Sequence, residues 1–469
     1  AHADVVAGSA ALASVVAADA RPASEAPRAD GRDVAATSSG PAFTAEPTTA
    51  PLPTAGSRRG DADPLPLPAF SAAPPSLPAP ASSRAASTAA ATAPDDGDAA
   101  DRVDEADHSD DSGAAGERAD PDHRDDLAGA ADGYVIAPVI AGCWQLAEGH
   151  RLTPMRLGSP SPIERLERCV ERGLYTFDCA DIYTGVEDLL GELRRRLPAA
   201  DAAKLRIHTK YVPDLESLGS LTRADVRRSI DRSLQRLGVE RIDLVQFHWW
   251  DLEVPGWVGV AGWLGELVDE GKVGRLGVTN FDTPQLRTLL DAGIPVRSHQ
   301  TQYSLLDRRP ERELVALCAE HHVDLLAYGT LAGGLLSERF RGAAPPEGDE
   351  NRSQMKYRLM VEERGGWEWL QQLLETLHAV ARRHGVTLSD VASAWVLGRQ
   401  QVAAVIVGVG ARSQPDPGAI TAVELTSQDH AALERVLGAA PEIPGGVYEL
   451  ERDRDGRHGR IMKYDLHED

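Results

Sequence analysis

Residues 173–183 read GLYTFDCADIY, and the interpretation of the whole chain starts from this stretch. A glycine precedes a short apolar run that ends at Asp178, and Tyr183 follows on the next loop. An apolar run of this length is typical of a strand that is covered on both faces. Residues at the carboxyl ends of such strands lie where barrel proteins bind their ligands. The stretch therefore predicts a buried parallel strand that carries an acid and a phenol at its functional end.

Similar apolar runs recur along the chain, and longer amphipathic segments separate them. The expected strands are residues 139–144, 174–178, 205–210, 242–248, 273–279, 296–301, 323–328 and 402–407. The expected helices include residues 162–172, 186–196, 223–237, 255–270, 284–292, 309–321 and 367–384. Eight strands that alternate with helices indicate parallel βαβ units of the α/β class, and this number favours a closed (β/α)8 TIM barrel. An open doubly wound sheet would need a glycine-rich turn after the first strand, where the sequence reads CWQL instead.

Two long insertions follow expected strands. Residues 211–221 come after the third strand, and residues 337–366 come after the seventh. Loops that follow strands lie on the carboxyl face of a barrel, which is the binding face. We therefore expect both insertions to shape a substrate or cofactor cleft.

Four polar residues lie at or just beyond the ends of successive expected strands. Asp178 and Tyr183 follow the second strand, Lys210 ends the third and His248 ends the fourth. Each alone is more often a solvated strand end, a packing residue or a satisfied polar group. Four of them at one mouth of a barrel indicate a catalytic site.

The chemistry of these four residue types explains why they would be gathered together. A phenol with a pKa near about 10 is a reluctant acid at neutral pH. A neighbouring ammonium favours the phenolate and lowers that pKa, and a carboxylate keeps the ammonium charged. The imidazole can hydrogen-bond a substrate carbonyl and orient it. Such a set can donate a proton to an oxyanion that forms as hydride reaches the carbon.

Several motifs carry a resemblance to a known family. They are residues 173–183, 208–210 (HTK), 244–248 (LVQFH), 271–281 (GKVGRLGVTNF), 300–303 (QTQY) and 327–335 (AYGTLAGGL), with 447–452 and 461–464 near the C-terminus. By these motifs residues 134–469 resemble the aldo-keto reductase superfamily, in its bacterial and plant-type branch. The resemblance implies a TIM barrel that uses NADPH to reduce aldehyde or ketone carbonyls. It also implies that Tyr183 is the general acid and that Lys210, Asp178 and His248 complete a tetrad.

The same resemblance implies a set of cofactor and substrate residues. Thr279, Asn280 and Gln300 would hold the nicotinamide carboxamide, and Tyr328 would stack on the nicotinamide ring. Residues expected along the pyrophosphate are Gly329, Thr330, Leu331, Gly333 and Leu335. Gly408, Gly410 and Arg412 would lie near the adenosine 2'-phosphate, and an arginine fork there favours NADPH over NADH. Trp144, Trp249 and Trp250 are the candidate substrate-pocket residues, with one of the last two expected to pack against the barrel rim. No metal site is expected.

The sequence departs from the family after the last expected strand. Residues 410–421 contain Pro415 and Pro417, which are expected to break a helix. This segment also lacks the Asn with which family members bind the adenine. Thr279 stands where Ser is usual, and Gly329-Thr330 stands where Ser-Pro is usual. The departures leave the choice between NADPH and NADH open.

Two other functions remain as alternatives. One is an NADP(H)-binding regulatory or interaction protein with little turnover, as the potassium-channel β subunits of this family illustrate. The other is a barrel aldolase or lyase that uses Lys210 as a Schiff base. The aldolase interpretation leaves Tyr183, Asn280 and Gln300 without a role.

The composition divides the chain at about residue 126. Residues 1–126 are rich in Ala, Pro and Ser, and Phe43 and Phe70 are their only aromatics. The end of this segment, residues 95–126, is acidic, with 14 acidic and 3 basic residues. Such a segment buries too little apolar surface to order itself, so we expect a disordered tail followed by one barrel domain over 127–469.

Charge and cysteine usage restrict the partners and the compartment. The chain has a formal net charge of -23 and no basic stripe, which argues against nucleic acid and anionic membranes. No run approaches the 18 apolar residues of a membrane span. The four cysteines form no C-x-x-C pair and are interpreted as buried thiols in a reducing compartment. A cytoplasmic monomer acting on a small carbonyl substrate is expected, with a plastid or mitochondrion as the alternative if the tail is the remnant of a transit sequence.

Removal of residues 1–126 should leave the barrel folded, because the tail contributes almost no apolar surface to a core. The measurement is thermal unfolding of residues 127–469 followed by circular dichroism. A truncated protein that melts without a cooperative transition would contradict the prediction.

Overall fold

The structure is a computed structural model that describes residues 134–152, 157–410 and 415–462. The predicted tail over residues 1–126 lies outside these ranges, as do the predicted domain boundary at residue 127 and the candidate residue Arg412. In the described part of the chain, no helix combines the length and the apolar content that a membrane crossing requires.

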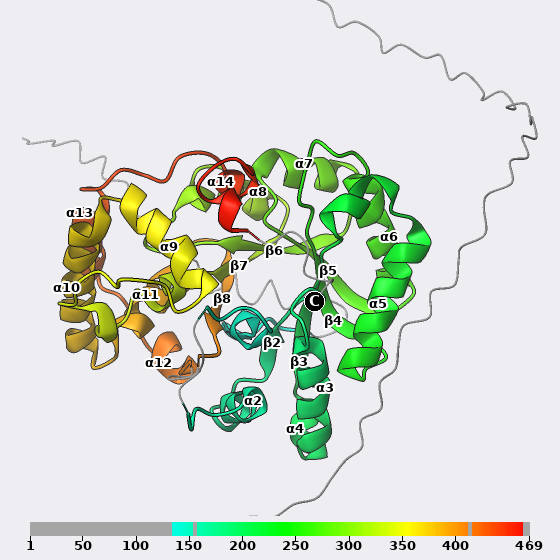
Figure 1. The fold of residues 1–469 in the computed structure, drawn as a ribbon, viewed down its shortest axis with the longest axis horizontal. Coiled ribbons are helices and arrows are strands. Elements are labelled where there is room, and N and C mark those ends of the chain that lie inside the picture. Colours follow the sequence, from blue (N-terminus) through cyan, green and yellow to red (C-terminus); the bar gives the residue numbers. More distant parts are fainter. Residues whose placement is uncertain (1–133, 153–156, 411–414, 463–469) are drawn as a thin grey trace, which may run out of the picture. The chain divides into compact units, whose positions relative to one another are not determined.

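Eight parallel strands close into a barrel in sequence order, with β1 paired to both β2 and β8 (Figure 1). The strands are β1 (Val139–Gly142), β2 (Thr176–Asp178), β3 (Arg206–Tyr211), β4 (Ile242–Phe247), β5 (Val273–Thr279), β6 (Val296–Gln302), β7 (Asp324–Tyr328) and β8 (Val402–Gly408). The predicted (β/α)8 barrel is confirmed, and each expected strand lies within a few residues of its observed position. Short runs rich in Val and Leu were sufficient to predict these strands, because strands that are covered on both faces are apolar along their whole length.

The predicted helices are all present, with small changes at their ends. They are α2 (Pro162–Glu171), α3 (Val186–Arg196), α5 (Arg223–Leu237), α6 (Trp257–Asp269), α7 (Thr283–Asp291), α8 (Leu314–Glu320) and α10 (Gly366–His384). Local sequence sets their bounds. Thr222 and Asp225 form a capping box at the start of α5, and Gly385 ends α10 in the left-handed conformation. The expected helix over residues 309–321 is instead a 3-10 turn (Arg309–Glu311) followed by α8.

Other helices were not expected from the sequence. They are α4 (Ala199–Ala202), α9 (Arg352–Glu363), α11 (Leu388–Leu397), α12 (Pro417–Thr421), α13 (Ser427–Leu437) and α14 (Glu449–Arg452). The expectation that Pro417 breaks a helix is wrong, because this proline is the first residue of α12 and its missing N–H would have no partner there. Asp416 caps that helix by accepting from the backbone N–H of Ala419.

Helices α9, α10, α11 and α13 gather on one side of the barrel, at the left of Figure 1. Helix α9 lies in the insertion after β7, and it packs against α10 and against the short turn Ala332–Gly334. The insertion that was expected to shape the cleft therefore brings a helix of its own beside the carboxyl end of β7.

The core has two layers. A small cluster of Ile140, Leu244, Leu326, Ala404 and Ile406 joins β4 to β1, β7 and β8. Because β4 is not a neighbour of those strands in the sheet, this contact passes through the inside of the barrel. The larger cluster fills the space between the barrel and its helices and includes all four cysteines, which are buried as predicted.

Helices α3 and α5 lie in close contact at Gly191. A Cβ at this position would clash with the backbone carbonyl oxygen of Arg236, near the end of α5. A backbone atom cannot move aside as a flexible side chain can, so the contact requires a glycine.

We expect Gly191→Ala to lower the free energy of unfolding by about 1–3 kcal/mol, the usual cost of overpacking. Gly259→Ala on α6 is the matched control, because a Cβ there meets nothing within 4 Å. The control should be neutral or stabilising by up to about 1 kcal/mol, since Ala has the higher helix propensity. Urea unfolding measures both, and equal effects of the two changes would contradict the close approach.

Candidate active site

A cleft of about 1260 Å³ opens at the carboxyl ends of the strands. Its lining includes all four members of the predicted tetrad, Asp178, Tyr183, Lys210 and His248. Strands β2, β3 and β4, together with the loop after β2, bring these side chains to one mouth of the barrel. The sequence-based expectation that they converge agrees with this geometry.

A buried ion pair between Asp178 and Lys210 lies at the base of the cleft. The Lys210 Nζ is 2.6 Å from Asp178 Oδ1 and also donates to the backbone oxygen of Cys179 at 2.8 Å. Both side chains are about 95% buried. Burial lowers the pKa of Lys210, but the charge of Asp178 and the hydrogen bond to its carboxylate outweigh that effect and raise the pKa above its usual value. Lys210 is therefore a fixed cation at neutral pH.

The second oxygen of Asp178 is held by two amides. Gln246 and Gln300 donate to Asp178 Oδ2 at 2.9 and 2.6 Å, and Gln300 also donates to Gln246 Oε1 at 2.9 Å. Gln246 was not among the sequence candidates. The strand period of two could have identified it, because residues 246 and 248 point to the same face of their strand. The carboxylate thus has a hydrogen bond on each oxygen and cannot rotate away from Lys210.

Tyr183 packs between the ammonium of Lys210 and the ring of Trp144. The Lys210 Nζ lies 5.0 Å from the Tyr183 ring centroid, and the Trp144 ring centroid lies 4.8 Å from it. Burial raises the pKa of Tyr183 to about 12, although the Lys210 charge lowers it. Lys210 lowers the pKa as expected, but desolvation of a phenolate outweighs the attraction of one ammonium, so the pKa rises in the net. Tyr183 is therefore a neutral phenol at neutral pH and holds a proton that it can donate.

His248 is buried and neutral. Its Nδ1 lies 3.2 Å from the backbone oxygen of Thr279. Burial and the nearby charge of Arg452 lower the pKa of His248 to about 3. A carbonyl oxygen only accepts, so the single ring hydrogen is on Nδ1 and the buried Nε2 carries a lone pair. The geometry favours acceptance of a hydrogen bond from a hydroxyl over the expected donation to a carbonyl.

Two amides near the tetrad match the groups of a carboxamide. Asn280 has a positive φ of 62° and its Oδ1 accepts from the Tyr328 hydroxyl at 2.8 Å, which directs Nδ2 away from that bond. Gln300 uses its Nε2 toward Asp178 and Gln246, which leaves Oε1 as an acceptor. Both residues line the cleft, as Thr279 does. One donor and one acceptor are what a nicotinamide carboxamide needs, so the residues present fit that group.

The turn after β7 runs close to the first turns of α9. A Cβ on Gly329 would clash with the Tyr357 hydroxyl, and a Cβ on Gly333 would come within 3.0 Å of the backbone at Ser353 and Gln354. Both glycines have positive φ. Among the candidates of this turn, those that line the cleft are Tyr328, Gly329, Thr330, Leu331 and Gly333. Leu335 does not line the cleft, because its side chain is fully buried in the core.

The end of β8 forms another wall of the cleft. Gly408 and Gly410 line it, and a Cβ on Gly408 would clash with the side chain of Gln145. Pro415 and Asp416 at the start of α12 also line it. This is the part of the cleft where the sequence predicts the adenosine side of a dinucleotide.

The three tryptophan candidates have different positions. Trp144 and Trp250 line the cleft, and the Trp250 ring meets the His248 ring edge-on with centroids 4.5 Å apart. Trp249 is fully buried against Phe247 and does not line the cleft, so it is a rim-packing residue and not a pocket residue. Two successive residues beyond a strand point in opposite directions, which explains why only one of this pair reaches the cleft.

Two loops meet beside the cleft. Arg151 in the loop after β1 pairs with Asn351 as an isolated antiparallel bridge, and the backbone N–H of Leu152 donates to Glu350 O at 3.1 Å. The insertion after β7 thus borders the cleft, as expected. From the insertion after β3, Val212 is the residue that reaches it.

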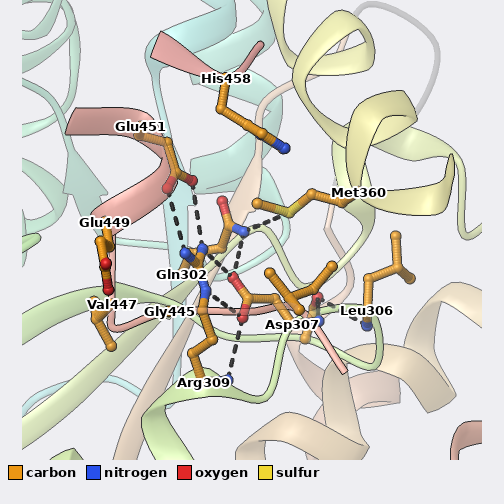
Figure 2. Close-up of polar contacts among 12 residues, drawn as sticks. Gln302, Leu306, Asp307, Arg309, Met360, Gly445, Val447, Glu449, Glu451 and His458 are labelled. Carbon is orange, nitrogen blue, oxygen red and sulfur yellow. Dashed lines mark hydrogen bonds and ion pairs between the residues drawn. The ribbon is translucent and has the colours of Figure 1, made fainter. Parts of the chain in front are cut away.

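A buried ionic network fixes the segment around α14 against the end of β6 (Figure 2). Arg309 donates to both carboxylate oxygens of Asp307, at 2.9 and 2.7 Å, and contacts Glu451 at 3.5 Å. Gln302 donates to Asp307 at 2.6 Å. The segment thereby places Tyr448 in the cleft, where its ring meets the His248 ring edge-on with centroids 5.7 Å apart.

Comparisons of this chain with known proteins agree on one family. Residues 138–437 match the model of the aldo/keto reductase family. A probable aldo-keto reductase 1 of Glycine max is 29% identical over 327 residues, which cover 67% of this chain and 89% of that protein. The NADH-specific methylglyoxal reductase of Escherichia coli is 28% identical over 236 residues, covering 49% of this chain and 69% of that relative. A solved glycerol dehydrogenase of Gluconobacter oxydans has the same fold, with a TM-score of 0.52, 24% identity and coverage of 66% and 93% of the two chains.

Acid should destabilise the barrel because it encloses neutral histidines. Burial lowers the pKa values of these side chains to about 4 for His150 and His208 and about 3 for His248 and His299. The unfolded chain takes up these protons near about pH 6.5, so stability is complete above that value and falls as pH drops below it. Each group contributes up to about 1.4 kcal/mol per pH unit. Urea unfolding from pH 7 to pH 4.5 measures the slope, which His299→Gln should reduce and which a flat profile would contradict.

Proposed function

This chain belongs to the aldo/keto reductase family, and we propose that it reduces aldehyde or ketone carbonyls with NADPH, with Tyr183 as the proton donor. The family acts on small-molecule carbonyl compounds and uses nicotinamide cofactors, so the chain is an oxidoreductase of that type. The observation that carries the proposal is the half-buried Tyr183 beside the buried pair of Lys210 and Asp178 at the base of the cleft.

Tyr183 holds the proton that the reaction needs. With its pKa raised to about 12 by burial, the phenol is protonated throughout the neutral range. When a substrate oxygen gains negative charge, its basicity rises above that of the phenolate and the proton of Tyr183 moves to it. The Lys210 ammonium, 5.0 Å from the ring centroid, stabilises the phenolate that results. Asp178 fixes that ammonium in place.

The neutral His248 orients the hydroxyl group of the product alcohol. Its Nε2 lone pair accepts the hydrogen bond of the alcohol that forms, while Nδ1 stays bound to the Thr279 carbonyl. Trp250 and Tyr448 pack edge-on against the imidazole and prevent it from turning. The ring is thus a fixed acceptor next to the proton donor.

Asn280 and Gln300 would hold the carboxamide of the nicotinamide, and Tyr328 would support its ring. The bound dinucleotide supplies the hydride. Thr279, the turn from Gly329 to Gly333 and the end of β8 at Gly408 and Gly410 would contact the remainder of the cofactor, which suits the length of the cleft.

The preference for NADPH is proposed from Arg412, whose guanidinium would pair with a 2'-phosphate. Arg412 lies outside the described residues, and the Escherichia coli relative is NADH-specific by name. The ratio of kcat/KM with NADPH to that with NADH measures the preference directly. Arg412→Ala should lower this ratio by about tenfold or more if a charge-assisted phosphate contact is lost.

The presence of all four tetrad side chains in one cleft supports turnover over the regulatory alternative. The Schiff-base alternative is disfavoured by Lys210, whose raised pKa keeps the amine protonated and poorly nucleophilic.

Tyr183→Phe should abolish carbonyl reduction, with kcat/KM lower by about 10²–10⁴-fold, the usual contribution of a positioned acid. The assay follows NADPH absorbance with the full chain and a panel of aldehydes, ketones and quinones. Tyr175→Phe is the matched control, because its hydroxyl bonds Asp201 and does not reach the cleft. Binding of NADPH, read by its fluorescence, should survive in both variants. Tight binding without turnover by the unaltered protein would favour the regulatory function.

A further inference from the structure

Lys356 brings an additional cation into the cleft. It lies on α9 within the insertion after β7, and its side chain is 13% exposed. Its Nζ is surrounded by three phenol rings, 5.3 Å from the centroid of Tyr448, 5.5 Å from that of Tyr328 and 5.9 Å from that of Tyr357. Aromatic faces stabilise an ammonium but take up none of its N–H donors.

The one carboxylate beside Lys356 is shared. The Lys356 Nζ is 3.0 Å from Oε1 of Glu451, whose side chain is completely buried. The same carboxylate also contacts Arg309 through both oxygens at 3.5 Å, as Figure 2 shows. Burial alone would raise the pKa of Glu451, but Lys356 and Arg309 lower it to about 2. Glu451 is therefore a permanent anion divided between two cations, and Lys356 has no other polar partner among the residues that the structure describes.

A second cation lies behind the same wall of the cleft. The guanidinium of Arg452 is 5.4 Å from the Tyr448 ring centroid and donates to the backbone oxygens of Asn280 and Trp249 at 2.7 and 3.4 Å. Within the described ranges it makes no ion pair closer than 4 Å. Burial lowers the pKa of Arg452, and the charges of Asp282 and Glu451 oppose that shift. Tyr448 thus lies near two incompletely paired cations.

The wall formed by Tyr448 is next to the reacting position. Its ring meets the ring of His248, whose Nε2 is where the product hydroxyl is proposed to bind. A substituent of a carbonyl compound that extends from this position along Tyr448 comes within reach of the Lys356 ammonium. The residues assigned to the dinucleotide phosphates, Thr330 to Gly333, line the same cleft, and their turn packs on α9.

We propose that Lys356 binds an anionic group of the substrate, so that the enzyme prefers carbonyl compounds that carry a carboxylate or a phosphate. The inference rests on the proposed function, since it specifies the substrate class of the same site. An ammonium with two spare donors, in a partly desolvated position, gains a charge-assisted hydrogen bond from such a group and gains nothing from a neutral one.

The test compares two aldehydes that differ in one charge, 4-carboxybenzaldehyde and methyl 4-formylbenzoate, with NADPH and the full chain. The measured quantity is the ratio of kcat/KM for the anionic aldehyde to that for the neutral one. We expect Lys356→Met to lower this ratio by about tenfold or more and Lys356→Arg to retain it. Lys272→Met, which removes a surface ammonium paired with Asp231, is the matched control and should leave the ratio unchanged.

Glu451→Gln separates binding of an anion from a structural role of the pair. If Lys356 instead anchors α14, Lys356→Met and Glu451→Gln both weaken the ion pair between these two residues. The ratio of kcat/KM for the anionic to the neutral aldehyde then stays constant or falls in both variants. If Lys356 binds the substrate, Glu451→Gln removes a competing carboxylate and raises the ratio. A ratio that is unchanged in Lys356→Met, or a loss confined to the affinity for NADPH, overturns the proposal.

A binding measurement distinguishes failure of this inference from failure of the proposed function. Calorimetry with NADP+ present compares 4-methylbenzoate and 4-methylbenzamide, neither of which can be reduced. Binding of the benzoate that is lost in Lys356→Met supports the inference even if no carbonyl is turned over. Equal affinities for the two compounds in the unaltered protein overturn it, whatever the activity.

Discussion

The ion pair of Asp178 and Lys210 is the interaction on which the rest of the site depends. Two charges buried this deeply cost several kcal/mol each in lost hydration, on the order given for buried ions. The structure offsets that cost with short-range bonds, because the carboxylate accepts from Gln246 and Gln300 and the ammonium donates to Cys179 O. The pair therefore stays charged and in one geometry. Tyr183 depends on that geometry, because the ammonium is the cation that is near enough to stabilise its phenolate.

Most of the barrel could be predicted from the sequence because its signals are local. An apolar run identifies β5, an amphipathic segment identifies α5, and the Thr222 capping box marks where α5 begins. Helix α9 was missed, because its sequence RSQMKYRLMVEE is mostly polar and charged and the helix packs on a turn distant in sequence. Pro417 was misinterpreted because a proline breaks a helix interior but suits a first turn, and the sequence alone does not say which position it takes.

The candidate site, like the fold, could be predicted from the sequence only in part. Asp178, Tyr183, Lys210 and His248 could be predicted because strand ends converge in a barrel whatever the loops do. Gln246 was not predicted as a site residue. The one signal in the sequence is its spacing of two from His248, which places both side chains on the same face of the strand. The pKa of Tyr183 and the tautomer of His248 could not be predicted, because they depend on burial and on a carbonyl oxygen 31 residues away. The family resemblance placed Leu335 along the cofactor, and it could not say which of Trp249 and Trp250 packs on the rim; Leu335 and Trp249 both face the core.

The contacts of Tyr448, Glu451 and Arg452 have a consequence for the order in which the molecule is made. Arg452 bonds a carbonyl oxygen 172 residues earlier, and Arg309 and Glu451 are 142 residues apart. On a ribosome all eight strands emerge before these three side chains do. The nascent barrel can therefore close and bury its core while the wall behind His248 is still missing. The segment that carries these side chains follows all eight strands and completes this wall of the cleft, so the finished cleft trails behind acquisition of the fold.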